Sequence, residues 1–352
     1  MSDEHFMRRA LELAENGRYT VSPNPMVGCV IVRDGAVVAE GWHRRAGEPH
    51  AEIEALRHCD DARGATMYVT LEPCAHHGRT PPCAEAVIAA KPARVVVAME
   101  DPNELVAGRG IAAMRAAGID VNVGVLEADA RRLNEKFLWS ITRKLPFVLL
   151  KAAMTLDGKL ATITRDSQWI TTADSREKSL LLREEYDAIL VGGGTVVTDN
   201  PRLTRRAGLA GEATRWTRVV LDGDGQVEAH AQVLNDGGRT ILFSSRDANA
   251  RSNVELIRTN GRLDLGHVFA ELYARGIHSV IAEGGALLHS ELIRRGLWQK
   301  MMLFIAPMIV GGGEAPSIFS GEGVARLTDA YRFRFDRAEF VGSDLLVTAY
   351  PI

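Results

Sequence analysis

The chain has 352 residues, of which 46% are hydrophobic and 25% charged, and its formal net charge is −3. This length predicts two or three domains, and the composition is that of an ordinary soluble globular protein. The slight acidity argues against a general basic surface for nucleic acid, and no apolar run is long enough for a membrane span. We expect no secretory leader. A secreted disulfide framework is not expected for the four cysteines in a chain of this length without a leader, and a reducing, cytoplasmic setting fits.

The first part of the sequence alternates between helix and strand patterns. In chain order it predicts a helix over 5–17, a hairpin over 27–32 and 36–40, a helix over 50–59, a strand over 67–70, a helix over 83–90, a strand over 94–99, a helix over 108–117 and a strand over 121–125. Such alternation predicts helices layered on one sheet. Residues 131–144 are predicted to form a basic helix or linker, and the break at Leu145-Pro146 sets a domain boundary near residue 145.

Potential metal ligands stand close together in this part, at Pro49-His50-Ala51-Glu52, Pro73-Cys74 and Cys83. One imidazole and two thiolates can hold Zn²⁺ and leave a fourth position for water, whose pKa the metal lowers towards neutrality. Glu52 is close enough to His50 in sequence to move protons without binding the ion. This is the H-x-E…P-C…C arrangement of the zinc nucleoside and nucleobase deaminases.

The two cysteines are separated by eight residues, more than the usual two. His76 and His77 in this gap are further potential ligands, but a closed four-ligand site would exclude the water. We therefore expect these histidines and Arg79 to line the substrate entrance. The alternative is structural: the cysteines would be small buried apolar residues, and His50 would simply begin a helix.

The second part of the sequence contains strand-like runs, several of which lead into glycines. Strands are predicted over 147–154, 188–191, 218–221, 240–243, 279–282 and 302–310, and glycine runs follow at 192–194, 284–285 and 311–313. A glycine-rich turn after a strand can bring backbone N–H groups close to a phosphate. None of the three matches G-x-G-x-x-G, since Val197 stands where a third glycine is required. Each alone is equally well a tight turn.

Longer motifs in both parts resemble one family, the bifunctional riboflavin-biosynthesis deaminase–reductases. In the first part these motifs are PNPMVG at 23–28, GEPHAE at 47–52 and TLEPCAHHGRTPPC at 70–83. In the second part they are KAAMTLDGK at 151–159, SQWIT at 167–171, GTV at 194–196, DNPRLT at 199–204 and EGG at 283–285. The resemblance covers essentially the whole chain in the expected order.

The resemblance implies an α/β protein with an amino-terminal cytidine-deaminase-like α/β/α domain over 1–145 and a dihydrofolate-reductase-like α/β domain over 146–352. The first domain would hold one Zn²⁺ and deaminate 2,5-diamino-6-ribosylamino-4(3H)-pyrimidinone 5′-phosphate. The second would use NADPH to reduce the ribose of that product to ribityl. The implied partners are a small phosphorylated pyrimidine and a second copy of the chain in a homodimer built on the reductase domains, with neither nucleic acid nor membrane.

The resemblance also implies roles for individual residues. Glu52 would be the catalytic proton shuttle, and His50, Cys74 and Cys83 the zinc ligands. Substrate contacts would be Asn24, Ser167, Arg183, Leu203, Arg206 and Glu283. Cofactor contacts would be Ala153, Trp169, Thr195, Asp199, Gly284, Gly285, Ala286, Leu287 and Leu288. Asn24 is equally well a turn residue between two prolines. Lys151 and Asp157 could each orient the sugar or assist proton transfer.

Two other hypotheses remain open at this stage. One is a cytidine- or tRNA-type deaminase fused to an unrelated reductase, against which the long gap between the cysteines and the acidic charge both argue. The other is a zinc-stabilised scaffold with structural glycine turns, for which Glu52 would be dispensable.

Overall fold

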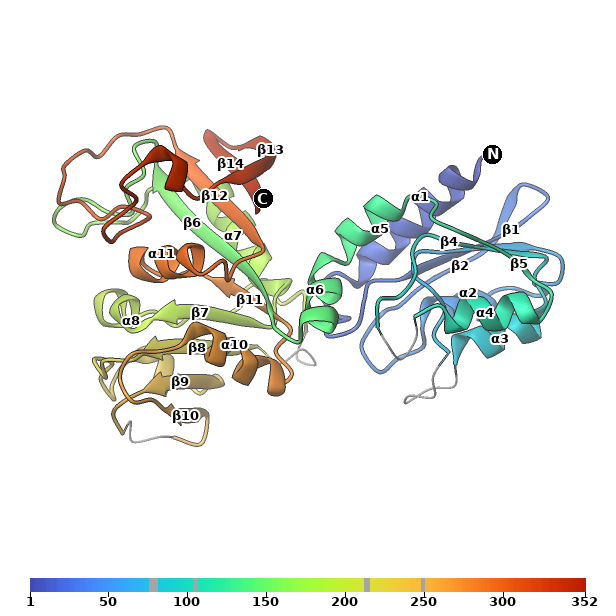
Figure 1. Ribbon diagram of the computed structural model, residues 1–352, viewed down its shortest axis with the longest axis horizontal. Coiled ribbons are helices and arrows are strands. Elements are labelled where there is room, and N and C mark those ends of the chain that lie inside the picture. The colour runs from blue at the N-terminus through green and yellow to red at the C-terminus, as the bar shows by residue number, and fades with distance from the viewer. Residues whose placement is uncertain (76–81, 104–106, 212–215, 248–250) are drawn as a thin grey trace. The chain divides into compact units, whose positions relative to one another are not determined.

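The computed structural model describes residues 1–75, 82–103, 107–211, 216–247 and 251–352 (Figure 1). The chain divides into two compact units, Met1–Leu145 and Pro146–Ile352. His76, His77 and Arg79, which we expect at the substrate entrance, lie outside the described residues. Over the ranges given above, no helix combines the length and the apolar character needed to cross a bilayer.

The first unit is a five-stranded sheet with helices packed on it (Figure 1). Its elements are α1 (Asp3–Ala14), η1 (Glu15–Gly17), β1 (Gly28–Arg33), β2 (Ala36–Trp42), α2 (Ala51–Arg57), β3 (Thr66–Val69), α3 (Cys83–Ala90), β4 (Arg94–Val97), α4 (Arg109–Ala116), β5 (Asp120–Val123), α5 (Glu127–Leu133) and α6 (Glu135–Arg143). The strand order is β2-β1-β3-β4-β5. Strand β1 is antiparallel to both of its neighbours, whereas β3, β4 and β5 are parallel.

Two glycines bring helices into close contact with this sheet. A Cβ on Gly28 would lie 2.0 Å from the Ala10 carbonyl oxygen of α1, and one on Gly41 would lie 2.4 Å from the Ala55 nitrogen of α2. Gly41 pairs with Cys29, the residue after Gly28, so the two glycines face opposite sides of the sheet. Helices α1 and α2 therefore cover opposite faces, and α2 begins beside β2.

The second unit is built on a nine-stranded sheet (Figure 1). Its elements are β6 (Phe147–Thr155), α7 (Ala173–Glu184), β7 (Ala188–Gly192), α8 (Gly193–Asp199), β8 (Thr217–Asp222), α9 (Gln232–Asn235), β9 (Thr240–Ser244), β10 (Val254–Arg258), α10 (Leu265–Ala274), β11 (Ser279–Ala282), α11 (Ala286–Arg294), β12 (Lys300–Ala306), η2 (Leu327–Asp329), β13 (Phe333–Val341) and β14 (Asp344–Pro351). The strand order is β10-β9-β8-β7-β11-β6-β12-β14-β13. The first seven strands in this order are parallel, and β14 and β13 add an antiparallel edge.

This order places the ends of β6, β7 and β11 side by side. Parallel strands end at the same edge of a sheet, so the residues that follow β7 and β11 share that edge with the end of β6. The three strands are almost entirely buried, in keeping with their aliphatic sequences. The edge is therefore a natural place for a ligand site.

The structure differs from the sequence-based prediction in two segments. The strand expected over 302–310 ends at Ala306, because Pro307 has no N–H to continue the ladder. The third glycine run, 311–313, is thus not directly attached to a strand. Residues 131–144, expected as one helix or linker, contain the end of α5 and all of α6, which meet at Asn134.

Candidate active sites

The three potential zinc ligands meet in the first unit. His50 is the residue before α2, Cys74 follows β3, and Cys83 is the first residue of α3. Their ligand atoms all lie within 4.8 Å of one another. The His50 Nδ1 is 3.2 Å from the Cys83 Sγ and 3.7 Å from the Cys74 Sγ. One imidazole and two sulfurs at this separation fit the donor set of a catalytic zinc site.

The protein itself favours one thiolate in this cluster. The pKa of Cys74 falls to about 4, because the Cys83 thiol, the His50 ring and the Cys83 backbone N–H all hydrogen-bond its sulfur. The same contact with Cys74 raises the pKa of His50. The pKa of Cys83 is raised, first by its hydrogen bond to Cys74 and then by burial. Ionising both sulfurs therefore calls for an additional cation.

Glu52 lies on the first turn of α2, two residues after His50, and is buried. Burial raises its pKa to about 7, with a smaller opposing effect from His50. A carboxyl group with a pKa near the working pH can both accept and donate a proton.

Asn24 is linked to the ligand segment through a residue that we did not predict. The Asn24 side-chain nitrogen is 3.0 Å from His43 Nε2, and His43 Nδ1 is 3.0 Å from the Pro49 carbonyl oxygen. His43 is buried, which lowers its pKa, and its ring meets that of His50 edge-on with centroids 5.2 Å apart. Its sequence signal, a lone histidine after a strand, is too weak to predict this role.

Glu72 is a second residue that sequence reasoning missed. Its buried carboxylate accepts backbone hydrogen bonds from Asp101, Gly108, Gly110 and Ile111, at 2.9 to 3.2 Å. These donors surround the start of α4. The carboxylate therefore ties the segment leading to Cys74 to a helix N-terminus, where negative charge is favoured.

In the second unit, three charged side chains converge at the edge formed by β6 and β11. Arg183 of α7 binds the Glu283 carboxylate through Nε at 2.9 Å and Nη2 at 3.0 Å, and the Lys151 Nζ lies 3.6 Å from it. All three side chains are at most 14% exposed. Burial would raise the pKa of Glu283, but Lys151 and Arg183 outweigh it and lower that pKa to about 2. The cluster keeps a net positive charge.

Several predicted cofactor positions gather at the same edge. Thr195 and Asp199 lie on α8 after β7, and residues 284–288 span the turn and first residues of α11 after β11. A Cβ on Gly285 would lie 3.6 Å from the Thr195 Oγ1, so the two turns are adjacent. Ala153 lies near the end of β6 in the same parallel layer. Burial raises the pKa of Asp199.

Other predicted residues differ from one another in exposure and contacts. Trp169 is 66% exposed, with the Arg176 guanidinium 4.5 Å from its ring centroid. Over the described ranges, no hydrogen bond links Ser167 or Trp169 to Glu283. Within residues 286–288, Leu287 is exposed and Leu288 buried.

The segment after α8 carries two predicted substrate contacts. Leu203 is buried, and its carbonyl oxygen accepts a hydrogen bond from the Trp216 indole at 2.8 Å. Arg206 is exposed. Arg183 also donates to the Thr204 carbonyl oxygen at 3.1 Å. Arg183 therefore joins this segment to Glu283.

The Asp157 carboxylate is engaged in structural hydrogen bonds. Its carboxylate accepts hydrogen bonds from the Thr155 hydroxyl at 2.6 Å and from the Val310 and Gly311 backbone at 3.2 and 2.7 Å. These contacts lower its pKa to about 2, the Thr155 bond first. Of the two candidates for proton transfer, Lys151 is the one that lies beside Glu283.

Two family models match this chain. The model of the cytidine and deoxycytidylate deaminase zinc-binding region matches residues 1–99, and the model of the RibD C-terminal domain matches residues 146–347. The riboflavin biosynthesis protein RibD of Escherichia coli K12 is 42% identical over 362 residues, covering 98% of each chain. The chain belongs to the RibD family. RibD of Bacillus amyloliquefaciens is 40% identical, covering 99% of this chain and 96% of its own.

A solved structure shares the whole architecture. The diaminohydroxyphosphoribosylaminopyrimidine deaminase/5-amino-6-(5-phosphoribosylamino)uracil reductase of Thermotoga maritima superposes with a TM-score of 0.91 at 39% identity, covering 99% of both chains. The RibD-family chain described here thus has an amino-terminal cytidine-deaminase domain and a carboxy-terminal RibD reductase domain. The fold class predicted from the sequence is confirmed.

Proposed function

We propose that this chain catalyses two consecutive steps of riboflavin biosynthesis. The domain over 1–145 deaminates 2,5-diamino-6-ribosylamino-4(3H)-pyrimidinone 5′-phosphate, and the domain over 146–352 reduces the ribosyl group of the product to ribityl with NADPH. The observation that carries the proposal is that a His–Cys–Cys cluster beside a buried carboxylate occurs in the same chain as a Lys–Arg–Glu cluster at the edge of a parallel sheet. Membership of the RibD family supports both steps.

In the deaminase domain, His50, Cys74 and Cys83 hold the zinc ion. The bound ion would supply a water molecule that is acidic enough to react near neutral pH. Glu52 takes one proton from that water and delivers it to the ring nitrogen. It then takes the second proton from the new hydroxyl group on the ring carbon and gives it to the amino group, which leaves as ammonia while the carbonyl forms. Its buried carboxyl group, with a pKa near 7, is suited to both directions of transfer. Asn24, oriented by His43, contacts the pyrimidine.

The test of this role is the substitution Glu52→Gln. The variant keeps the shape of the side chain but cannot shuttle a proton, so deamination falls by at least about 10³-fold while one zinc per chain is retained. Ammonia release and metal content are measured on the same sample. Glu54→Gln is the matched control, because Glu54 lies on the same helix, outside the ligand cluster, and forms ion pairs with the exposed Arg57 and Arg44. Ammonia release by Glu52→Gln at the Glu54→Gln rate refutes the role.

In the reductase domain, the dinucleotide occupies the edge formed by α8 and the turn before α11. Thr195, Asp199 and residues 284–288 contact it, together with Ala153 and Trp169. The bound dinucleotide supplies the hydride. Arg206, exposed on its segment, binds the substrate phosphate, and Ser167, Leu203, Arg183 and Glu283 complete the substrate contacts.

Reduction of the ribosyl group to ribityl opens the sugar ring. One hydride is added to the sugar carbon, and the ring oxygen that is released takes up one proton. Lys151 is placed to provide this proton, since its ammonium group is buried beside Glu283. Glu283 orients Lys151 and is itself held by Arg183. The experiment is to supply the deaminated substrate and follow NADPH oxidation. Lys151→Met abolishes oxidation while NADPH still binds. The choice of cofactor is tested separately with the wild-type protein, and equal rates with NADH and NADPH would contradict a preference for NADPH.

We also propose that the chain forms a homodimer through β13. Among the strands that the structure describes, this one pairs with β14 alone and ends the sheet, and it exposes Phe335 at 70% and Phe340 at 80%. An edge strand with exposed aromatic side chains is a ready surface for pairing with a second copy. Phe335→Glu combined with Phe340→Glu shifts the protein to monomers in sedimentation equilibrium. A monomeric wild-type chain at micromolar concentration contradicts this part of the proposal.

A further inference from the structure

A buried arginine lies beside the segment that carries the proposed reductase contacts. Arg218 belongs to β8 and is 1% exposed. A guanidinium group cannot lose its charge, so burying it is costly unless the surrounding groups pair with it and accept its hydrogen bonds. Its position in a strand whose other residues are mostly aliphatic is therefore a feature that packing alone does not explain.

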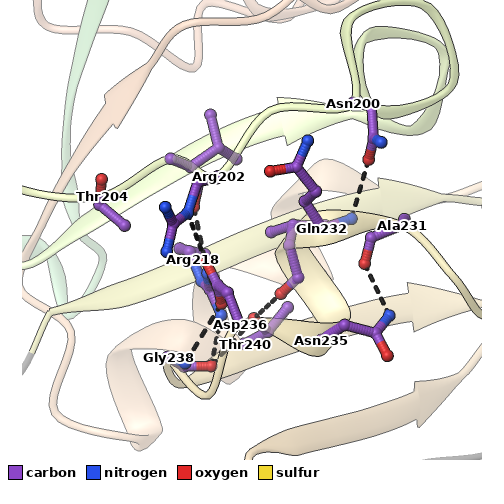
Figure 2. A network of polar contacts seen from close by, with 12 residues as sticks. Asn200, Arg202, Thr204, Arg218, Ala231, Gln232, Asn235, Asp236, Gly238 and Thr240 are labelled. Carbon is purple, nitrogen blue, oxygen red and sulfur yellow. Dashed lines mark hydrogen bonds and ion pairs between the residues drawn. The ribbon is translucent and has the colours of Figure 1, made fainter.

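The partners of Arg218 come from two different segments (Figure 2). Its Nη1 pairs with the Asp236 carboxylate and its Nη2 donates to the Gly238 carbonyl oxygen, both in the turn between α9 and β9. The same Nη1 also donates to the Arg202 carbonyl oxygen at 3.1 Å. The guanidinium therefore fastens the backbone after α8 to the turn before β9.

A second contact joins the segment after α8 to the start of α9. The Asn200 side-chain oxygen accepts a hydrogen bond from the Gln232 backbone N–H, at the start of α9, at 2.8 Å (Figure 2). Asn200 ends α8 with φ 42°, a left-handed conformation that asparagine and glycine tolerate. The exposed Arg202 side chain adds only a loose ion pair, with its Nε 3.7 Å from the Asp236 Oδ2.

The segment fastened in this way is the one that matters for binding. Residues 200–206 contain no helix or strand, and they lie between Asp199, a proposed cofactor contact, and Arg206, a proposed phosphate contact. Leu203, a proposed substrate contact, directly follows the residue whose carbonyl group Arg218 holds. A loop without its own backbone ladder keeps one conformation only when side chains from neighbouring elements hold it.

We infer that Arg218 is a positioning residue of the reductase site: by binding the Arg202 carbonyl group and the Asp236 carboxylate together, it fixes residues 199–206 in the conformation that binds the dinucleotide and the phosphorylated sugar. The inference rests on the proposed reductase activity. A purely structural ion pair would contribute to the stability of this domain without affecting the affinity for either ligand.

The experiment compares Arg218→Lys with the wild-type protein. Lysine keeps the charge but lacks the fork that reaches three acceptors at once. We expect the KM for NADPH and for the phosphorylated substrate to rise about tenfold, while kcat changes less than about threefold, because the loop is loosened and the reacting groups are unchanged. Deamination by the same molecules stays at the wild-type rate and serves as an internal control. Unchanged KM values overturn the inference.

Two surface variants decide the matter if Arg218→Lys does not fold. Asn200→Gly keeps the left-handed backbone but loses the acceptor for Gln232, so it raises both KM values. Asn200→Asp keeps the acceptor and restores them. Asn253→Ala is the control, since Asn253 donates to the Gly238 carbonyl oxygen at 2.8 Å, and that bond does not reach residues 199–206. If Asn200→Gly binds both ligands as tightly as Asn253→Ala does, the inference is wrong.

Failure of the proposed function would look different. A wild-type protein that does not reduce the substrate at all refutes the reductase assignment, and the role of Arg218 is then judged by hydrogen exchange. Faster exchange in residues 200–206 of Arg218→Lys or Asn200→Gly, relative to Asn253→Ala, supports the positioning role. Equal exchange in all of them overturns it.

Discussion

The two domains assemble their sites in different ways. The proposed zinc ligands and Glu52 all lie between positions 50 and 83, at the starts of two helices and after one strand. The proposed reductase residues extend from Lys151 to Leu288, and the charged cluster and the glycine turns among them come together because β6, β11 and β7 are neighbours in the sheet. The first site can therefore be recognised from residue types and spacing, whereas the second depends on topology.

The domains are alike in how they hold the segments that carry these residues. In the first, the buried Glu72 carboxylate accepts four backbone N–H groups and ties the Cys74 segment to α4. In the second, the buried Arg218 guanidinium donates to the backbone after α8, and Glu184 accepts from Ala207 and Ala210 at 3.1 and 3.2 Å. A single buried charge can fix several backbone groups at once, so loss of one such residue loosens a whole segment.

The largest expected effect separates the two sites completely. Cys83→Ala removes one zinc ligand, and we expect deamination to fall by at least about 10³-fold with loss of the bound metal. Reduction of separately supplied deaminated substrate stays within about twofold of the wild type, because all the proposed reductase residues lie between positions 151 and 288. The measurements are zinc content, ammonia release and NADPH oxidation on one preparation.

Cys59→Ala is the matched control, since Cys59 is a free cysteine of the same domain outside the cluster. A Cys83→Ala protein that retains zinc and releases ammonia normally would exclude the proposed ligand set. Loss of both activities together would mean that the two sites are not independent.

The converse experiment removes the carboxylate at the centre of the reductase cluster. Glu283→Gln leaves the buried Lys151 and Arg183 without a counter-charge. We expect reduction to fall by about 10² to 10³-fold, because an unpaired buried charge costs about 3–5 kcal/mol and Lys151 loses its orientation. Glu291→Gln on α11 is the control, since that residue forms ion pairs with Arg294 and Arg295 and lies outside the Lys151–Arg183–Glu283 cluster. Deamination at the wild-type rate in Glu283→Gln completes the comparison; a normal rate of reduction in this variant would contradict the role of Glu283.

The sequence predicts more of the first site than of the second, because the first lies in a short stretch of the chain and the second depends on topology. The strands and helices of the first domain follow ordinary apolar patterns, and its motif lies within a short stretch, so the cluster could be expected. Helix α7, which carries Arg183, was not predicted, because its buried residues include Ser175, Ser179 and Glu184. A helix with a polar buried face has no amphipathic pattern to recognise.

Three contributors to the sites could not be found without the structure. His43, Glu72 and Arg218 each act through backbone groups or rings that are distant in the sequence or belong to other elements. A lone histidine, glutamate or arginine carries no spacing signal. The β13–β14 hairpin was also not predicted. The homodimer was expected from the family resemblance alone, without a surface for it. Long-range hydrogen bonds of this kind are set by topology, which residue types alone do not specify.

A smaller effect tests whether Glu72 is the counterpart of Arg218. Glu72→Gln keeps the size of the side chain but leaves one carbonyl oxygen for four backbone N–H donors. Its amide NH₂ group then faces donors that have lost their acceptor. We expect a loss of about 2–3 kcal/mol in the stability of the first domain and faster hydrogen exchange at the start of α4. Zinc is then lost at lower chelator concentrations than in wild type, although Glu72 binds no metal. Glu54→Gln again serves as control; equal chelator sensitivity of the two variants would leave Glu72 without a positioning role.

The smallest expected effect is a difference between the domains in acid. His289 of α11 is buried, and burial lowers its pKa to about 4. Since an unfolded histidine titrates near 6.5, the folded domain favours the neutral ring. The resulting stability is fully present above pH 6.5 and is lost as the pH falls towards 4. The loss is about 2 kcal/mol at pH 5.

Protection factors of β11 amides, which correct for intrinsic exchange, should therefore fall between pH 7 and pH 5. In His289→Gln this dependence is reduced, while amides of β4 in the first domain behave alike in both proteins. An equally steep loss in His289→Gln would assign the acid sensitivity to other groups and remove His289 as its cause.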